Sequence, residues 1–154
     1  MKSRIDVKRI PPQTIRPLLA LGAQSESAGL EPALLELVKM RASQINGCAY
    51  CLDMHWKDLC AVGEREQRLY SLDAWRESPY YTDRERAALQ WTEAVTQVAK
   101  DQVPDAVYEA VRPHFSDKEL ADLTLAVATI NAWNRLSIAA RLTPGTYVPS
   151  QLTT

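Results

Sequence analysis

Two cysteines and a histidine that could together carry out redox chemistry lie close to one another in the sequence. Cys48, Cys51 and His55 occur in the segment CAYCLDMH, at spacings of three and four residues. An α-helix completes one turn in about 3.6 residues, so side chains at these spacings project from one face. We therefore expect both thiols and the imidazole to meet in one small space, where a disulfide could form and break next to a base.

Physical chemistry alone leaves open which of the two thiols would react first. A thiol reacts as its thiolate, and a free cysteine with a pKa of about 8.5 is mostly protonated at neutral pH. The positive end of a helix beginning at Cys48 would favour that residue as the nucleophile, whereas closeness to His55 favours Cys51. If Cys51 attacks a hydroperoxide it becomes a sulfenic acid. Cys48, at about 5 to 6 Å between Cβ atoms, is close enough to condense with it to a disulfide.

The composition is that of an ordinary globular protein and indicates neither nucleic acid nor a membrane as a partner. Of the 154 residues, 46% are hydrophobic and 24% are charged, and the net charge is -1. No apolar run approaches the roughly 20 residues of a membrane helix, and the first residues do not have the pattern of a secretory signal. Three cysteines, an odd number, argue against a disulfide framework. We expect a cytoplasmic protein in a reducing compartment.

The elements that must position the cysteines and the histidine are predicted to be helices. Apolar residues recur at helical spacing along the chain, and no segment has a convincing strand pattern. We predict an all-α fold in a single domain, residues 1–154, with an extended arm at 1–12 and an extended tail at 144–154. The predicted helices cover residues 14–24, 32–45, 48–62, 64–72, 82–98, 104–112 and 116–141.

Local signals mark several of the predicted helix ends. Pro32 suits the first position of a helix, and Asn46-Gly47 tolerates the positive φ that ends one and turns the chain into the next. The S/T-x-x-E pattern of a capping box occurs at Thr82–Glu85 and again at Ser116–Glu119. The apolar stripes of the last two long helices are predicted to consist of Ala88, Trp91, Val95 and Val98, and of Leu120, Leu123, Val127, Ile130 and Ile138.

The predicted helix at 32–45 is apolar on most of its sides, with Glu36 interrupting the run Leu34 to Val38. Such a helix belongs in the middle of an assembly. We expect it to present more apolar surface than one small monomer can cover, and therefore predict a homo-oligomer.

Glu36, Cys48, Cys51 and His55 together form the pattern E-x11-C-x2-C-x3-H. This pattern resembles the core motif of the alkylhydroperoxidase D (AhpD) family, part of the carboxymuconolactone decarboxylase-like superfamily. The amino-acid sequences of residues 41–51 and 131–135 also resemble those of small single-domain members, so the resemblance covers about residues 30–142. It implies an AhpD-like helical domain with its core motif at 36–55, assembled as trimers or hexamers. The implied activity is reduction of organic hydroperoxides at the expense of a thiol or dithiol reductant, without a bound cofactor.

The resemblance also implies a role for each residue of the motif. Cys51 would attack the peroxide and Cys48 would resolve the sulfenic acid, while His55 would act as base and Glu36 would orient and charge it. One position departs from the well-studied peroxidases of the family, which carry histidine where this chain has Tyr50. The departure removes one candidate proton carrier. Decarboxylase members lack the Cys-x-x-Cys pair, so its presence here argues against that activity.

Other functions fit part of the pattern. The chain could be a general disulfide oxidoreductase with peroxide as a poor substrate, or a non-enzymatic redox sensor or oligomeric binding protein. A zinc site that uses Cys60 and His55 is disfavoured, because Cys60 follows Cys51 by nine residues and should lie half a turn away. Cys60 is expected to be a small buried hydrophobe, and His114 to be structural.

Several further residues have simple structural interpretations. Glu36 taken alone would be a solvated residue paired with Lys39, and Trp91 and Trp133 lie on helical stripes where packing is the usual role. A polar cluster interrupts the last helix, and we expect it to cap buried backbone or to cross a subunit interface. Its members are Asn131, Asn134 and Arg135.

Overall fold

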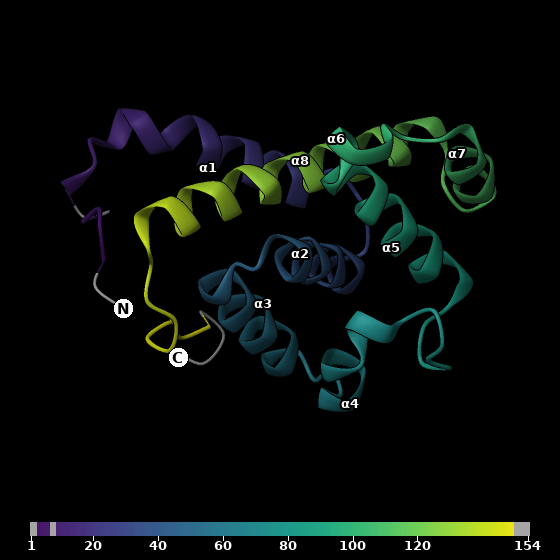
Figure 1. The fold of residues 1–154 in the computed structure, drawn as a ribbon, viewed down its shortest axis with the longest axis horizontal. Helices are drawn as coiled ribbons and strands as arrows, with labels where there is room; N and C mark the ends of the chain where they lie inside the picture. The colour runs from purple at the N-terminus through teal and green to yellow at the C-terminus, as the bar shows by residue number, and fades with distance from the viewer. Residues whose placement is uncertain (1–2, 7–8, 150–154) are drawn as a thin grey trace.

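The computed structural model describes residues 3–6 and 9–149, and it is helical, with no β-strand among these residues. The all-α prediction is therefore confirmed (Figure 1). In chain order the elements are α1 (Pro12–Glu26), α2 (Pro32–Asn46), α3 (Ala49–Ala61), α4 (Glu66–Tyr70), η2 (Leu72–Ala74), α5 (Asp83–Thr96), α6 (Val98–Asp101), α7 (Asp105–Val111), η3 (Arg112–His114) and α8 (Asp117–Ala140).

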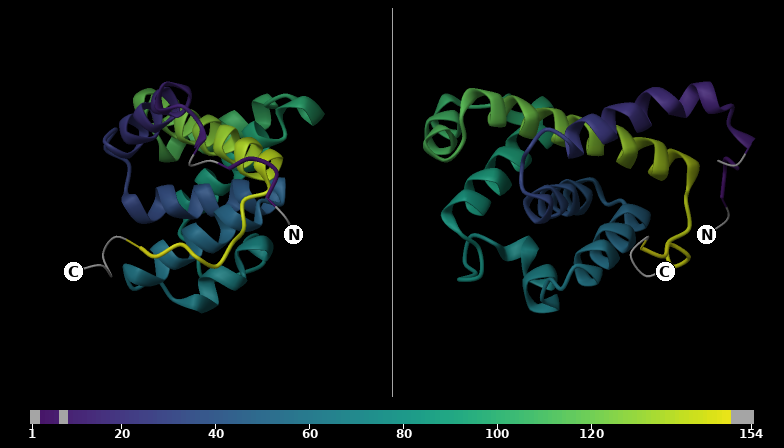
Figure 2. Two further views of the ribbon diagram at one scale, coloured as in Figure 1. Left: turned by 90° about the vertical axis from the view of Figure 1, so that its left-hand side faces the viewer. Right: turned by 180° about the vertical axis from the view of Figure 1, so that it is seen from behind.

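Helix α2 lies in the middle of the molecule. It packs against α3, α5 and α8, while α1 lies beside α8, and these two helices are on the opposite side of the molecule from α4 (Figures 1 and 2). Residues from opposite faces of α2 enter two separate core clusters. Leu34, Leu35 and Val38 pack with side chains of α5, α7 and α8, whereas Leu37 and Met40 pack with side chains of α3, α4, η2 and α5.

The central position of α2 removes the reason for which we predicted an oligomer. Its five large apolar side chains between Leu34 and Met40 are each no more than 5% exposed within the single chain. Helices of the same chain cover the surface that was expected to need a second subunit. The homo-oligomer stays a prediction, and it now rests on the family resemblance alone.

The predicted helix ends agree with the structure where a local signal marks them. Both capping boxes form, at Thr82–Glu85 and at Ser116–Glu119, and Gly47 ends α2 with φ 69°. The last residue of each predicted apolar stripe is not buried, since Val98 is 51% and Ile138 44% exposed. Helix α5 ends at Thr96, so Val98 belongs to the next helix. Ile138 lies at the same angle on the helix as Leu120, about five turns earlier, but toward the end of α8 the buried residues are instead Asn131, Asn134, Ser137 and Ala140.

The two ends of the described chain depart in part from the predicted extended segments. Pro12 is the first residue of α1, so the arm is shorter than predicted, and Arg4 donates from its backbone N–H to the Ala140 carbonyl at 2.9 Å. Residues 146–149 have no regular secondary structure, and the extended tail stays a prediction. The predictions for 1–2, 7–8 and 150–154 lie outside the described residues. Nowhere in the part of the chain that the structure describes is a helix both long and apolar enough to cross a membrane.

The polar cluster on α8 links this helix to the end of α2. Asn46 Nδ2 donates to Asn131 Oδ1 at 3.0 Å and to Asn134 Oδ1 at 2.9 Å, and Asn134 Nδ2 donates to Ser43 Oγ at 3.0 Å. Asn134 is fully buried. The cluster therefore bridges two helices through side chains, and it fixes the end of α2 directly before Cys48.

Replacing Asn134 by alanine should destabilise the protein by about 1 to 3 kcal/mol, because Ser43 and Asn46 lose a buried partner. Chemical denaturation, followed by circular dichroism, measures this change. Leu136→Ala is the matched control on the same helix, since this side chain is 46% exposed and its loss should change stability by no more than about 0.5 kcal/mol. Equal losses in the two variants would show that the bridge contributes nothing beyond ordinary contacts.

Candidate active site

The two cysteines lie at the corner where α2 turns into α3. The left-handed conformation of Gly47 ends α2, and Cys48 follows at once as the N-cap residue of α3. The Cys51 backbone N–H donates to Cys48 Sγ at 3.4 Å. Cys48 and Cys51 are joined in a disulfide, with 5.4 Å between their Cα atoms, and they are only 1% and 2% exposed. The structure thus brings the two sulfur atoms together, as their spacing predicts.

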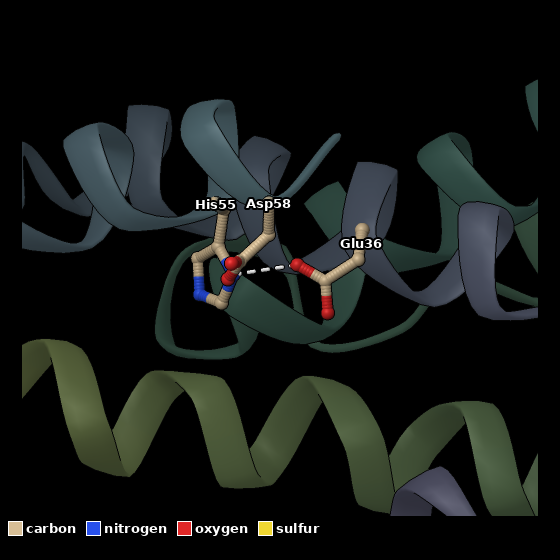
Figure 3. Close-up of side chains that lie close together, drawn as sticks. All are labelled: Glu36, His55 and Asp58. Atoms are coloured by element: carbon tan, nitrogen blue, oxygen red, sulfur yellow. Dashed lines mark hydrogen bonds and ion pairs between the residues drawn. The ribbon is translucent and has the colours of Figure 1, made fainter. Parts of the chain in front are cut away.

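His55 and Glu36 complete the set of residues that the sequence singled out. His55 lies one turn beyond Cys51 on α3, and its Nδ1 is 2.8 Å from Glu36 Oε2 (Figure 3). The other carboxylate oxygen of Glu36 accepts from Lys39 Nζ at 2.7 Å. Residues from α2 and α3 therefore converge on one spot, and the pairing of Glu36 with Lys39 occurs together with its contact to His55.

The charges around Glu36 keep it ionised. Burial acts to raise the pKa of this carboxyl, but the hydrogen bond and charge of His55 and the charge of Lys39 outweigh burial. Together they lower the pKa of Glu36 from 4.5 to about 2. At any pH where the protein is expected to work, Glu36 is a carboxylate beside the imidazole.

The contact with Glu36 determines what the other ring nitrogen of His55 can do. When the ring is neutral, a carboxylate at Nδ1 favours the tautomer with hydrogen on Nδ1, which leaves a lone pair on Nε2. Nε2 is turned away from Glu36 (Figure 3), is buried, and has no hydrogen-bond partner within the described residues. The neutral ring of His55 therefore has a basic Nε2 without a partner among the described residues, one helical turn after Cys51.

An apolar cavity of about 530 Å³ opens beside these residues, between α1, α3 and α8. Cys51 and His55 are part of its lining, whereas Cys48 is not. Most of the remaining lining is apolar, and it includes Leu19, Met54, Ile130 and Trp133. Its volume lies within the range of small-molecule sites in proteins, about 300 to 1,000 Å³. Trp133, interpreted from the sequence as a packing residue, thus also faces the cavity, as does Tyr50.

Asp58 is a further acidic residue at the site. Single ligand atoms of Glu36, His55 and Asp58 all lie within 4.8 Å of one another (Figure 3). Each already has a partner of another kind: Lys39 donates to Glu36, Glu36 contacts His55, and the Tyr147 hydroxyl donates to Asp58. The ammonium group of Lys39, bound to Glu36, repels a metal cation. The arrangement is therefore better suited to proton transfer than to binding a metal ion.

Cys60 lies apart from the other two cysteines. It is partly buried and packs against the cluster formed by Leu37, Leu59 and neighbouring side chains. Burial raises the pKa of its thiol, so it is a weaker nucleophile than an exposed cysteine. It packs against apolar side chains, as expected, but it is only partly buried.

Sequence reasoning did not single out Asp58 or Tyr147. Asp58 follows His55 by three residues and so lies on nearly the same helix face, a signal that was available in the spacing. Tyr147 reaches the site from a tail 89 residues further along the chain. No local pattern predicts such a contact.

Comparisons with known proteins agree with the fold. The sequence model of the carboxymuconolactone decarboxylase family matches residues 12–94. An uncharacterised protein of Bacillus subtilis, YdfG, is 39% identical over 139 residues, which cover 90% of this chain and 95% of that protein. A solved structure from Agrobacterium tumefaciens, a protein of unknown function described as a candidate AhpD antioxidant defence protein, is 42% identical. Its TM-score is 0.91, with 95% of this chain and 100% of that chain covered.

A more distant structure shares the fold alone. It is a peroxidase-related protein from Ralstonia eutropha with an alkylhydroperoxidase AhpD core, 22% identical, with a TM-score of 0.75. The similarity covers 88% of this chain and 72% of that chain.

Proposed function

The chain belongs to the carboxymuconolactone decarboxylase family and is AhpD-like within it, and we propose that it is a thiol-dependent peroxidase. Its substrates are organic hydroperoxides, which it reduces through a dithiol and disulfide cycle of Cys48 and Cys51. The observation that carries the proposal is that Cys51 and His55 line one apolar cavity, while the Nε2 of His55 has no hydrogen-bond partner among the described residues.

In the first step the Cys51 thiolate attacks an oxygen of the hydroperoxide. An S–O bond forms, the O–O bond breaks, and an alkoxide leaves. His55 Nε2 takes the proton of the Cys51 thiol and supplies it to the alkoxide, which becomes an alcohol. Glu36 holds the ring through Nδ1 and stabilises the positive charge that His55 acquires.

In the second step Cys48 restores a disulfide. Its sulfur attacks the sulfur of the Cys51 sulfenic acid, an S–S bond forms and the S–O bond breaks. The leaving hydroxide takes the proton that the Cys48 thiol gives up and departs as water. A dithiol reductant then returns two electrons and two protons to the pair. The product of the second step is the disulfide between Cys48 and Cys51 that the structure contains.

The cavity supports the assignment of Cys51 as the attacking residue and of an organic peroxide as its substrate. Cys51 lines the cavity and Cys48 does not, so a bound ligand meets Cys51 first. Side chains such as Leu19 and Trp133 would bind an alkyl or aryl group by the hydrophobic effect, which hydrogen peroxide cannot exploit. Low exposure of both cysteines also favours a small substrate over a protein disulfide.

General disulfide oxidoreduction is the second candidate, because Tyr50 occupies the position of a histidine in the well-studied peroxidases. A redox sensor without turnover is the third. With excess dithiothreitol, we expect kcat/KM for cumene hydroperoxide to exceed that for oxidised glutathione by about tenfold or more. Faster reduction of glutathione disulfide would support the oxidoreductase. Oxidation of the pair without turnover on either substrate would support the sensor.

A further inference from the structure

The described part of the C-terminal tail returns to the helix that carries the cysteines. After α8 ends at Ala140, the chain folds back along α3 (Figures 1 and 2). The Gly145 N–H donates to Asp53 Oδ2 at 2.9 Å, and Lys57 Nζ donates to the carbonyls of Gly145 and Tyr147, both at 3.2 Å. Two side chains of α3, one turn apart, therefore hold the tail in place.

This anchoring places the ring of Tyr147 beside Asp58. The Tyr147 hydroxyl donates to Asp58 Oδ1 at 2.7 Å, and the Asp58 carboxylate lies next to the contact between His55 and Glu36 (Figure 3). A hydrogen-bonded or closely spaced series thus runs from the tail through Asp58 to the base of the proposed reaction.

Asp58 is in an environment where its charge needs support. Burial raises the pKa of its carboxyl, and the negative charge of Glu36 raises it further, while the hydrogen bond from Tyr147 opposes both. The hydroxyl of Tyr147 in turn has its pKa raised by burial and by Asp58, so it remains a donor. Tyr147 therefore favours the carboxylate form of Asp58, and Asp58 favours the protonated hydroxyl of Tyr147.

We propose that Asp58 and Tyr147 are positioning residues for proton transfer at His55, with Tyr147 holding Asp58 as a carboxylate beside the imidazole. The reaction that they serve rests on the proposed function. When His55 takes the proton of Cys51, its positive charge faces two carboxylates instead of one. The tail is then part of the active site and not only a covering segment.

The charged groups around His55 come from three helices and the tail. Glu36 and Lys39 belong to α2, Asp58 to α3 and Tyr147 to the tail, while Glu26 of α1 accepts from Lys39 at 3.1 Å. Loss of either carboxylate leaves the imidazolium less stabilised. A less stable imidazolium disfavours the thiolate of Cys51 with which it pairs.

The test is the pH dependence of Cys51 alkylation by iodoacetamide in the reduced protein, with mass spectrometry to distinguish the three cysteines. We expect Asp58→Asn to move the midpoint of this profile upward by about one pH unit, so that the rate at neutral pH falls about tenfold. Tyr147→Phe should move it in the same direction by less, with a fall of about threefold. At high pH, where the Cys51 thiol is ionised in every variant, Tyr147→Phe should react like the unaltered protein.

A double variant separates positioning from simple structural support. If Tyr147 acts through Asp58, Tyr147→Phe should have no further effect when Asp58→Asn is already present. Tyr70→Phe is the matched control, since this tyrosine is 72% exposed on α4, and it should leave the profile unchanged. An unchanged midpoint in Asp58→Asn, or an equal effect of Tyr147→Phe with and without Asp58, would overturn the proposal.

The test stays decisive if Asp58→Asn does not fold, and also if the protein does not reduce hydroperoxides. Should Asp58→Asn not fold, an unshifted profile in Tyr147→Phe alone is enough to overturn the proposal. Alkylation needs no peroxide, so a protein that shows these shifts but does not consume hydroperoxides would contradict the proposed function and leave the positioning roles supported.

Discussion

Cys51→Ser should abolish consumption of cumene hydroperoxide, with a fall of about a thousandfold or more in rate. A serine hydroxyl is not ionised at neutral pH and cannot form a sulfenic acid, so the first step of the proposed cycle has no nucleophile. The change is nearly isosteric at a buried position, so the fold should persist. Peroxide loss under excess dithiothreitol measures the rate, and circular dichroism checks the helices.

Cys48→Ser is the companion that separates the two cysteines. After reduction and removal of dithiothreitol, it should reduce one equivalent of peroxide and then retain a sulfenic acid on Cys51, because no neighbouring thiol is left to condense with it. Cys60→Ser should turn over normally, since Cys60 packs in a different cluster. Full activity in Cys51→Ser would remove that residue from the reaction, and a burst in that variant would reverse the two roles.

Glu36→Gln should lower kcat/KM for the hydroperoxide by about 10² to 10³-fold, the second largest effect that we predict. An amide can bond to either state of the ring, so it neither fixes the tautomer with a free Nε2 nor stabilises the imidazolium. Stopped-flow measurement of Cys51 oxidation across pH tests this, with an upward shift of the profile expected. Glu109→Gln is the control, an exposed glutamate on α7 that is paired only with Arg112 among the described ion pairs.

Glu36→Gln should also change how the free energy of unfolding depends on pH. The pKa of Glu36 is lowered from 4.5 in the unfolded chain to about 2 in the fold, so the carboxylate stabilises the fold fully above about pH 4.5. This contribution is lost as pH falls toward 2. The difference in free energy of unfolding between the unaltered protein and Glu36→Gln should therefore be greatest near neutral pH and should disappear near pH 2. A difference that does not depend on pH would mean that the carboxylate charge contributes nothing.

The helices of the site could be predicted well because their signals are local. Cys48, Cys51 and His55 share a helix, and the positive φ of Gly47 follows from its type and its neighbour. Glu36 lies on the preceding helix, and only the resemblance to the family connected it with the cysteines. Its contact with His55 depends on how α2 and α3 pack, which periodicity alone does not give.

The parts that could not be predicted depend on long-range packing. The end of the α8 stripe continues through Asn134 and not Ile138, because buried amides there match polar groups at the end of α2. The pairing of Tyr147 with Asp58 joins a tail without regular structure to a helix far earlier in the chain. The expected oligomer was argued from α2 as if it stood alone, whereas α3, α5 and α8 cover it.

The single glycine between α2 and α3 has a consequence for engineering. No spare loop residues separate the two helices, so residues 32–61 form one hairpin in which the carboxylate and the thiols are held in fixed register. One residue inserted at this corner would rotate everything after it by about 100° if it extended the helix. Linkers or fusions therefore belong elsewhere in the chain, where they leave the spacing between Glu36 and the two cysteines unchanged.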